Sequence, residues 1–238
     1  MGIFDKLQTA NLEEQKDSLG GSGLFDTDIY AAKVKVAYVG YAKSGAMNIN
    51  LVLDIDGREY RETIYITNRN GDNFWTRDGK KYPLPGFTTI NDLCVLTNEK
   101  QLSEMDTESR VFKIWDFEQK AEVNKEVPCI VDLLGKEVNV GIVRKVENKT
   151  ALGSSGKYEP TNEKRELNEI NKFYYHDRDN MLTVFEAMHQ KDAEFAKKWL
   201  EKNKGKVQDK FKEVAGGSRV GGAAPATDAP KPKKSLFG

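Results

Sequence analysis

Three observations predict a mainly β fold with α-helical additions. Residues 33–39, 48–55 and 59–67 each alternate apolar and polar side chains, which is typical of half-buried strands. A turn dipeptide joins the second segment to the third, and one helical segment precedes the next long strand. The expected order is a three-strand meander, a helix, a fourth strand, a polar loop and a closing strand. It matches the five-stranded OB-fold barrel; a β-sandwich is the competing architecture, which the single clear helix disfavours.

The meander is the firmest local prediction. Asp56-Gly57 lies between two alternating segments, and both residue types tolerate the positive φ of a tight hairpin turn. In the first strand we expect Val34, Val36 and Tyr38 on the core face. The second strand sets Ile49, Leu51, Leu53 and Ile55 against Asn48, Asn50 and Val52. The three strands therefore share one apolar face and one polar, partly basic face.

Additional segments are inserted before the fourth strand. Residues 68–87 carry the turn dipeptides Asn70-Gly71 and Asp78-Gly79 and predict a protruding hairpin or a long loop. Residues 88–97 have helical spacing, with Thr89 and Asp92 in capping-box positions. Residues 111–117 and 127–134 are short strand candidates in acidic surroundings, which we expect to face away from any polyanion.

The C-terminal half continues the β pattern and then changes character. Residues 136–148 predict a long strand, 149–168 a polar loop and 169–176 the last strand. Asp179 or Asn180 is expected to cap helical material from Met181 to about Asn203, with a break at Asp192. The expected units are a lead-in (1–23) with a short helix from Asn11, the OB-fold domain (24–178), a helical extension (179–205) and a disordered tail (206–238). The tail is basic, rich in Gly, Ala and Pro, and ends in Leu-Phe.

Composition excludes several classes of function. The 238 residues have a formal net charge of zero, so no global charge indicates nucleic acid or membrane. Cys94 and Cys129 have no CxxC spacing, which indicates buried thiols in a reducing compartment and neither a metal nor another cofactor. No signal peptide or long apolar run is present, and we expect a soluble intracellular protein without a membrane partner.

Catalytic signatures are scarce. The sequence has no phosphate-binding glycine loop, no HExxH motif and only two histidines. We therefore expect that the protein is not an enzyme. Asp54, Asp56 and Glu59 resemble a carboxylate cluster for a metal-dependent nuclease. They flank the predicted hairpin turn, where Asp is favoured for conformation alone.

Aromatic and basic residues instead gather around the meander and the inserted segment. Single-stranded nucleic acid is bound by aromatic planes that stack on bases and by cations that contact phosphates. OB folds bind it around their second and third strands and the neighbouring loops. The candidate DNA-binding residues are Lys33, Lys35, Tyr41, Lys43, Asn48, Asn50, Arg61, Tyr65, Arg69, Phe74, Trp75, Arg77, Lys80, Lys81 and Tyr82. Trp115, Phe173, Tyr174 and Tyr175 are interpreted as core or as an edge of a homo-oligomer.

Several runs of the sequence carry a family resemblance. GREYRETIYITNRNG (57–71), KKYPLPGFTTINDLCVLT (80–97), VPCIVDLLGKEVNVGIVRKVENKT (127–150) and the terminal SLFG resemble single-stranded DNA-binding proteins of tailed bacteriophages. The likeness is to podoviruses whose virions carry an RNA polymerase, and it covers residues 5–205 and the last four. It implies an OB-fold that coats single strands in phage DNA replication, recombination and sometimes transcription, in the cytoplasm of the infected host.

The resemblance also implies partner enzymes that bind the C-terminus. Leu236 and Phe237 end a flexible linker, which suits a short docking motif for replication, recombination or RNA polymerase proteins. Many proteins of this function end in an acidic tail, whereas Lys231, Lys233 and Lys234 precede Leu236 here. The resemblance therefore does not imply that the C-terminal tail of this chain competes with DNA for the binding groove. The alternatives are a protein-interaction accessory factor for a phage polymerase and the nuclease above.

Overall fold

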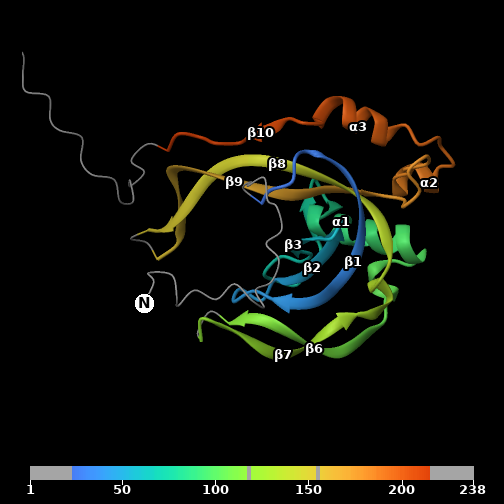
Figure 1. The fold of residues 1–238 in the computed structure, drawn as a ribbon. Helices are drawn as coiled ribbons and strands as arrows, with labels where there is room; N and C mark the ends of the chain where they lie inside the picture. Colours follow the sequence, from blue (N-terminus) through green and yellow to red (C-terminus); the bar gives the residue numbers. More distant parts are fainter. Residues whose placement is uncertain (1–22, 117–118, 154–155, 215–238) are drawn as a thin grey trace, which may run out of the picture.

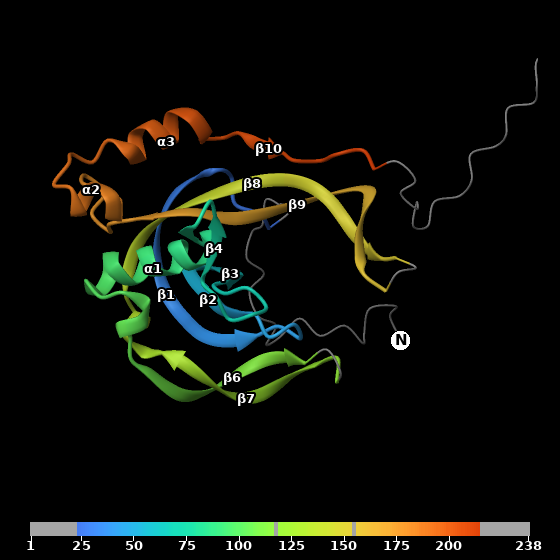
Figure 2. The same ribbon diagram turned by 180° about the vertical axis from the view of Figure 1, so that it is seen from behind.

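The computed structural model describes residues 23–116, 119–153 and 156–214 and is mainly β (Figures 1 and 2). The strands are β1 Asp28–Tyr41, β2 Met47–Ile55, β3 Arg58–Tyr65, β4 Phe74–Arg77, β5 Lys80–Pro83, β6 Thr107–Asp116, β7 Ala121–Ile130, β8 Glu137–Leu152, β9 Tyr158–Tyr174 and β10 Val207–Asp209. The helices are α1 Pro85–Asn98, α2 Val184–Met188 and α3 Phe195–Asn203, with single 3-10 turns at Leu102–Glu104 and Val131–Leu133.

The main sheet has eight strands rather than five. Its central order is β3-β2-β1-β8-β9; β10 also pairs with β8, and the β6–β7 hairpin joins at β1. The strands β4 and β5 form a separate hairpin. No backbone ladder joins β3 to β9 within the described ranges, so the sheet is open at this seam and the expected closed five-stranded barrel is not shown.

Strand β1 changes partner halfway along its length. Its first residues, 28–33, pair with β8, and residues 33–41 pair with β2. Val34 and Val36 pair with consecutive β2 residues, Leu53 and Val52, so Lys35 is the extra residue of a β-bulge. Beyond the bulge the alternation is shifted by one residue. Val34 faces the core as expected, but the prediction that Tyr38 and Val36 share that face is wrong.

The seam between β3 and β9 is bridged by a side chain. The carboxylate of Glu62 accepts hydrogen bonds from the Tyr60 hydroxyl (2.6 Å) and from the backbone N–H of Ile170 (2.8 Å). Burial raises the pKa of Glu62, although both hydrogen bonds act to lower it. Glu62 on β3 and Ile170 on β9 thus stand in for a ladder hydrogen bond.

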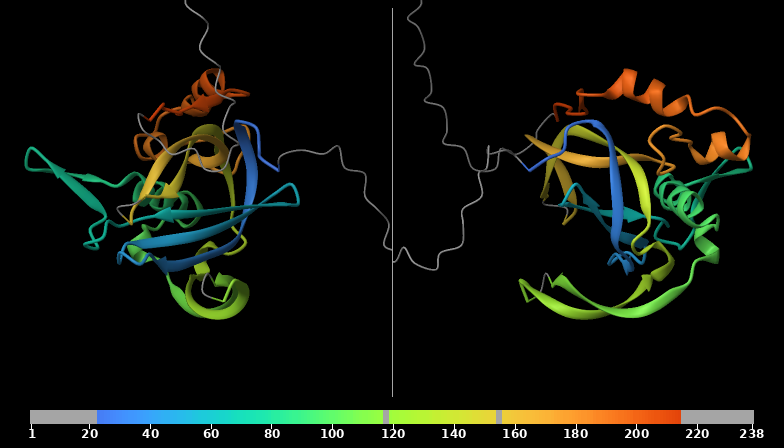
Figure 3. Two further views of the ribbon diagram at one scale, coloured as in Figure 1. Left: turned by 90° about the vertical axis from the view of Figure 1, so that its left-hand side faces the viewer. Right: turned by 45° about the vertical axis from the view of Figure 1, so that its right-hand side comes forward.

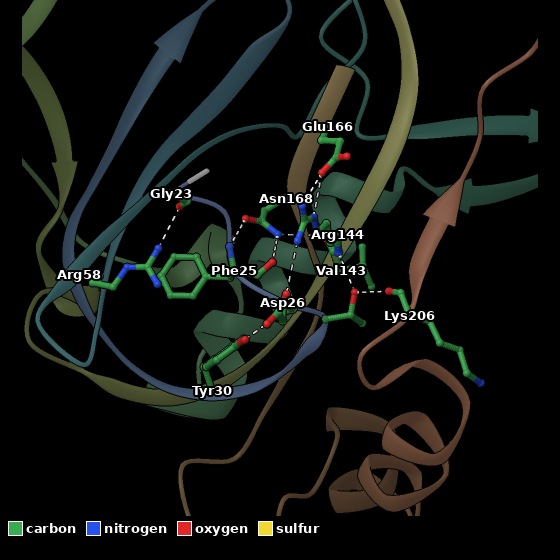
Figure 4. A network of polar contacts seen from close by, with 11 residues as sticks. Gly23, Phe25, Asp26, Tyr30, Arg58, Val143, Arg144, Glu166, Asn168 and Lys206 are labelled. Atoms are coloured by element: carbon green, nitrogen blue, oxygen red, sulfur yellow. Dashed lines mark hydrogen bonds and ion pairs between the residues drawn. The ribbon is translucent and has the colours of Figure 1, made fainter. Parts of the chain in front are cut away.

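The segment before β1 fills the rest of this seam (Figure 4). The Asn168 side chain accepts from Phe25 N and donates to Phe25 O, at 2.7 Å each. The Phe25 ring packs edge-on against Tyr60, and the Arg58 guanidinium lies over the Phe25 ring, 4.1 Å from its centroid. Residues 23–27 therefore connect β3 to β9 by side-chain and aromatic contacts.

Helix α1 covers one opening of the curled sheet. Ile90, Leu93 and Cys94 are buried in the core with residues of β1, β2, β3, β8 and β9. The helix begins at Pro85, whose missing N–H suits a first turn, and Leu84 provides no side-chain cap. The capping box expected at Thr89 and Asp92 is therefore wrong, because both residues lie inside the helix.

Gly86 permits the close approach of this helix to the sheet. A Cβ atom at Gly86 would overlap the backbone carbonyl oxygen of Tyr65, the last residue of β3, and would lie 3.1 Å from Cγ2 of Ile64. Only a residue without a side chain fits at this position. Gly86 thus sets the distance between the start of α1 and the end of β3.

The polar loop expected at residues 149–168 is wrong. Strand β8 extends to Leu152 and β9 begins at Tyr158, and the two pair as a long hairpin in which oppositely charged residues face each other. Arg165 pairs with Glu147 at 2.5 Å, and Lys149 pairs with Glu163 at 3.1 Å. The polar sequence therefore encodes a solvent-exposed ladder.

The C-terminal extension contains two helices, and the expected break at Asp192 is confirmed. The cap is Thr183 rather than Asp179 or Asn180, and it forms a capping box with Glu186. The carboxylate of Glu186 also accepts from the backbone N–H groups of Glu194 (3.0 Å) and Phe195 (2.7 Å). Burial opposes ionisation, but these hydrogen bonds outweigh it and lower the pKa of Glu186.

Residues 207–214, at the start of the tail predicted from residue 206, contact the main sheet. Val207–Asp209 form β10, which runs parallel to β8, and the side chain of Asn162 holds Val214 through its N–H and C=O. The expected lead-in helix and the rest of the tail lie outside the described residues. Cys94 and Cys129 are buried free thiols, as expected. Among the described helices, none has the length and apolar character needed to cross a membrane.

Candidate nucleic-acid interface

The β4–β5 hairpin holds six of the fifteen predicted DNA-binding residues. It projects away from the main sheet (Figure 3, left), and its register places Trp75 opposite Tyr82 and Arg77 opposite Lys80. Because successive residues of a strand alternate between faces, these four side chains share one face of the hairpin. The other predicted pair, Phe74 and Lys81, lies on the opposite face, with the Lys81 Nζ 4.2 Å from the ring centre.

Trp75 and Tyr82 form an exposed aromatic platform. Their rings stack with centroids 4.8 Å apart and an interplanar angle of 24°. Each nevertheless keeps a large accessible surface, 44% for Trp75 and 39% for Tyr82. An aromatic residue of this segment, such as Trp75, could either pin the segment to the main sheet or form part of a binding surface. The exposure favours the second, since the pair packs on itself and remains open to solvent.

The outer face of the meander holds the strand residues of the predicted site. The ladder aligns Asn48 with Tyr65, Asn50 with Thr63 and Val52 with Arg61 on this face. Tyr65 is 52% exposed, whereas Asn48 is only 5% exposed and accepts from the Asn50 amide at 2.8 Å. Asn48 therefore orients Asn50 rather than contacting a ligand directly.

A carboxylate partly neutralises the basic residues at one end of this face. Glu59 lies between Lys35, at 2.8 Å, and Arg61, at 2.7 Å. The hydrogen bonds from Lys35 and Arg61 lower the pKa of Glu59. Two cations share one anion, which leaves one net positive charge for a phosphate. Lys33, at the same end of the face, is exposed.

The remaining predicted residues lie on two adjacent connections. Tyr41 and Lys43 are exposed at the β1–β2 connection, and Arg69 is exposed in the loop after β3. A Cβ at Gly45 would lie 3.6 Å from the Arg69 carbonyl oxygen, so these connections touch. The base of the β4–β5 hairpin, where Leu84 N donates to Asn73 O, follows directly. Loops and hairpin thus continue the surface beyond Tyr65.

The β6–β7 hairpin, which we name the arm, lies beside the meander. A groove separates the two. It has a volume of about 410 Å³ and is lined on the meander side by Tyr38, Asn50 and Arg61, among others. The arm side contributes Phe112, Lys113 and Trp115, together with the acid Glu122. The Tyr38 and Phe112 rings stack at 5.6 Å across the two elements.

Residues 112–115 thus lie beside the predicted site residues Asn50 and Arg61, although we expected this segment to face away from any polyanion. Trp115, interpreted from sequence as core or oligomer edge, is 51% exposed and borders the groove. Residues 111–116 alternate, with Val111, Lys113 and Trp115 exposed and Phe112 and Ile114 half-buried. The sequence of this segment, VFKIWD, does not alternate apolar and polar residues, so it gave no signal that Trp115 is exposed.

The carboxylate cluster considered for a nuclease is part of the β2–β3 turn. Asp54 accepts from the backbone N–H of Gly57 at 2.8 Å, and Asp56 has a φ of 52°. Glu59 is engaged with its two cations. Across the residues that the structure describes, no group of three or more His, Cys, Asp or Glu is placed to hold a metal ion.

Leu236 and Phe237, predicted to bind a partner, lie outside the described residues. The family resemblance stays a prediction that rests on the quoted runs. A functional assignment has to rest on the hairpin platform, the meander face and the groove. No protein-family model matches the chain, and no curated protein is significantly similar to it in sequence.

Proposed function

We propose that this chain is a sequence-tolerant single-stranded DNA-binding protein and not an enzyme. The observation that carries the proposal is the β4–β5 hairpin, which presents a stacked Trp75 and Tyr82 pair with Arg77 and Lys80 on one face. Aromatic faces stack on any base, and the cations beside them attract the phosphate chain. The meander face continues this surface through Tyr65 and Arg61.

The strand order supports an OB-type barrel as the scaffold. The central strands run β3-β2-β1-β8-β9, with α1 between β3 and β8, and an OB-fold has its five strands and its helix in this order. In this proposal Glu62 and residues 23–27 take the place of the missing ladder between β3 and β9. The hairpin β4–β5 and the arm are then insertions beside the binding face.

The biological setting is proposed on the resemblance alone. The chain would coat single strands in phage DNA replication and recombination, and would assist transcription, in the cytoplasm of the infected host. Leu236 and Phe237 would recruit replication, recombination or RNA polymerase proteins. A homo-oligomer is compatible with this role.

A protein-interaction accessory factor is the second candidate. Phe185, Met188 and Phe195 are exposed on the C-terminal extension, and Phe185 and Phe195 line a hollow of about 650 Å³. Exposed apolar side chains gathered in this way suit a protein partner. The two candidates differ in their response to salt, because only nucleic-acid binding releases counterions from a phosphate chain.

Oligo-dT affinity measured against salt concentration tests the proposal. We expect log K to fall linearly with log[salt], with a slope of about −0.7 for each phosphate contacted. Absence of binding, or an affinity that does not respond to salt, would contradict the function and favour the accessory factor.

Trp75→Ala is expected to weaken oligo-dT binding by about 1–3 kcal/mol, because one stacking plane is lost. The melting temperature should change little, since Trp75 is 44% exposed. Phe185→Ala, which truncates an exposed aromatic residue on α2, is the matched control and should bind as the wild type does. Early unfolding of Trp75→Ala would instead assign Trp75 a structural role.

A further inference from the structure

The arm is held against the meander at one region and is open elsewhere. Among the described residues of the arm, the backbone pairs with β1 at Tyr38 and Cys129, and the stacked Tyr38 and Phe112 rings hold the arm there. Farther along β6, toward the tip of the arm, Trp115 borders the groove and remains 51% exposed. Trp199, by contrast, is a buried tryptophan. It is 6% exposed and donates its indole N–H to Asn171.

The polar groups of the groove are suited to bases more than to phosphates. Asn50 and Thr63 on its floor are linked, with the Thr63 hydroxyl donating to the Asn50 carbonyl oxygen at 2.8 Å. Amides and hydroxyls of this kind hydrogen-bond base edges. Apart from Glu62 at the seam, four charged side chains line the groove. Two are cations, Arg61 and Lys113, and two are acids, Glu59 and Glu122.

This balance of charge determines the orientation of a bound strand. A phosphate chain along the floor would gain no net attraction from two cations and two acids. Bases directed inward avoid that problem, since they can stack on Trp115, while the phosphates stay at the rim near Lys113 and Arg61. The groove therefore suits the bases of a single strand.

We propose that the arm forms the second wall of the single-strand binding site and that Trp115 stacks on a base within it. This inference rests on the proposed function and extends it from the β4–β5 hairpin to the opposite side of the meander. It also assigns a role to the stacked Tyr38 and Phe112 pair, which positions the arm at the width of the groove.

Trp115→Ala is expected to lower oligo-dT affinity about ten-fold, the loss typical of one stacked base. Trp115→Phe keeps an aromatic plane and should recover most of the affinity. Phe185→Ala is again the matched control and should stay within about two-fold of the wild type, because a surface aromatic outside the site contributes no stacking. All variants are compared at one salt concentration and checked for an unchanged melting temperature.

Fluorescence supplies a second readout that does not depend on a destabilising change. In Trp75→Phe the emission comes from Trp115 and the buried Trp199. Oligo-dT should still quench part of this emission if Trp115 stacks on a base. The quenching should disappear in the double variant Trp75→Phe/Trp115→Phe.

The outcomes separate this inference from the proposed function. If the wild type does not bind oligo-dT, both are overturned. If the wild type binds and Trp75→Ala binds weakly, while Trp115→Ala binds as the wild type and Trp75→Phe shows no quenching, the function stands and the role of the arm is overturned. If Trp115→Ala unfolds early, two other measurements test the role of the arm. Near wild-type affinity of Trp115→Phe together with residual quenching in Trp75→Phe supports that role, and the absence of residual quenching overturns it.

Discussion

Gly86→Ala is expected to lower the free energy of unfolding by about 3 kcal/mol, at the upper end of the cost of overpacking. The added methyl group would overlap the carbonyl oxygen of Tyr65, which is backbone and part of the β3 ladder. Neither partner can move by a rotamer change, so the first turn of α1 has to shift. Thermal unfolding should show a melting temperature lower by roughly 6–12 °C.

Pro85→Ala is the matched control for this change. It alters the neighbouring residue at the first position of α1, which is exposed, and adds no atom toward β3. Its melting temperature should stay close to that of the wild type. A Gly86→Ala variant as stable as Pro85→Ala would contradict the close packing of α1 on β3.

Glu62→Ala is expected to cost about 2–4 kcal/mol, because it leaves two buried hydrogen-bond donors without their acceptor. The Tyr60 hydroxyl, on the same strand, and the Ile170 N–H, across the seam, both donate to the Glu62 carboxylate. Tyr60 is buried, so its hydroxyl does not regain a full water contact. Urea unfolding at constant pH measures the loss.

Glu62→Gln separates the hydrogen bonds from the charge. Its carbonyl oxygen can accept from both donors, and it carries no ion to bury. The pKa of Glu62 is raised by burial, so the folded state binds more protons than the unfolded state over the interval between the two pKa values. The stability contributed by protonated Glu62 is present below its unfolded pKa and is lost as pH rises through its folded pKa.

The wild type should therefore lose stability relative to Glu62→Gln as pH rises from the unfolded-state pKa of Glu62 through its higher folded-state pKa, and the difference should be constant above that. Urea midpoints of both proteins over this range give the comparison. If the stability of the wild type instead rises relative to that of Glu62→Gln with increasing pH, the two hydrogen bonds affect the pKa of Glu62 more strongly than burial does.

Local patterns predicted the elements better than their contacts. The Asp56-Gly57 turn appears where the sequence places it, with φ values of 52° and 77°. The bulge at Lys35 was not predictable, because it depends on β1 leaving β8 to join β2. This one extra residue places Val36 and Tyr38 on the face opposite to the predicted one. The strand was therefore predicted correctly, but its outward-facing residues were not.

Pairings between distant segments limited the prediction in other places. The β8–β9 hairpin is stabilised by charges such as Arg165 and Glu147, which appear as a solvated loop until their register is known. Trp75 and Tyr82 could be named as candidates because they lie in one short segment, but the stacking of their rings was not predicted. The groove was missed because Tyr38 and Phe112 meet only through the fold. Within the site, proximity in sequence decided what could be found.

The short strand β10 protects an edge of the sheet. Strand β8 pairs with β1 as far as Ile142, and from Arg144 to Val146 that side of β8 pairs with β10 instead. A chain that ended at residue 205 would leave these backbone groups unpaired, and exposed strand edges associate with other copies of the chain. Truncations intended to remove only the C-terminal tail should therefore retain residues up to Val214, so that aggregation is not mistaken for the loss of a partner.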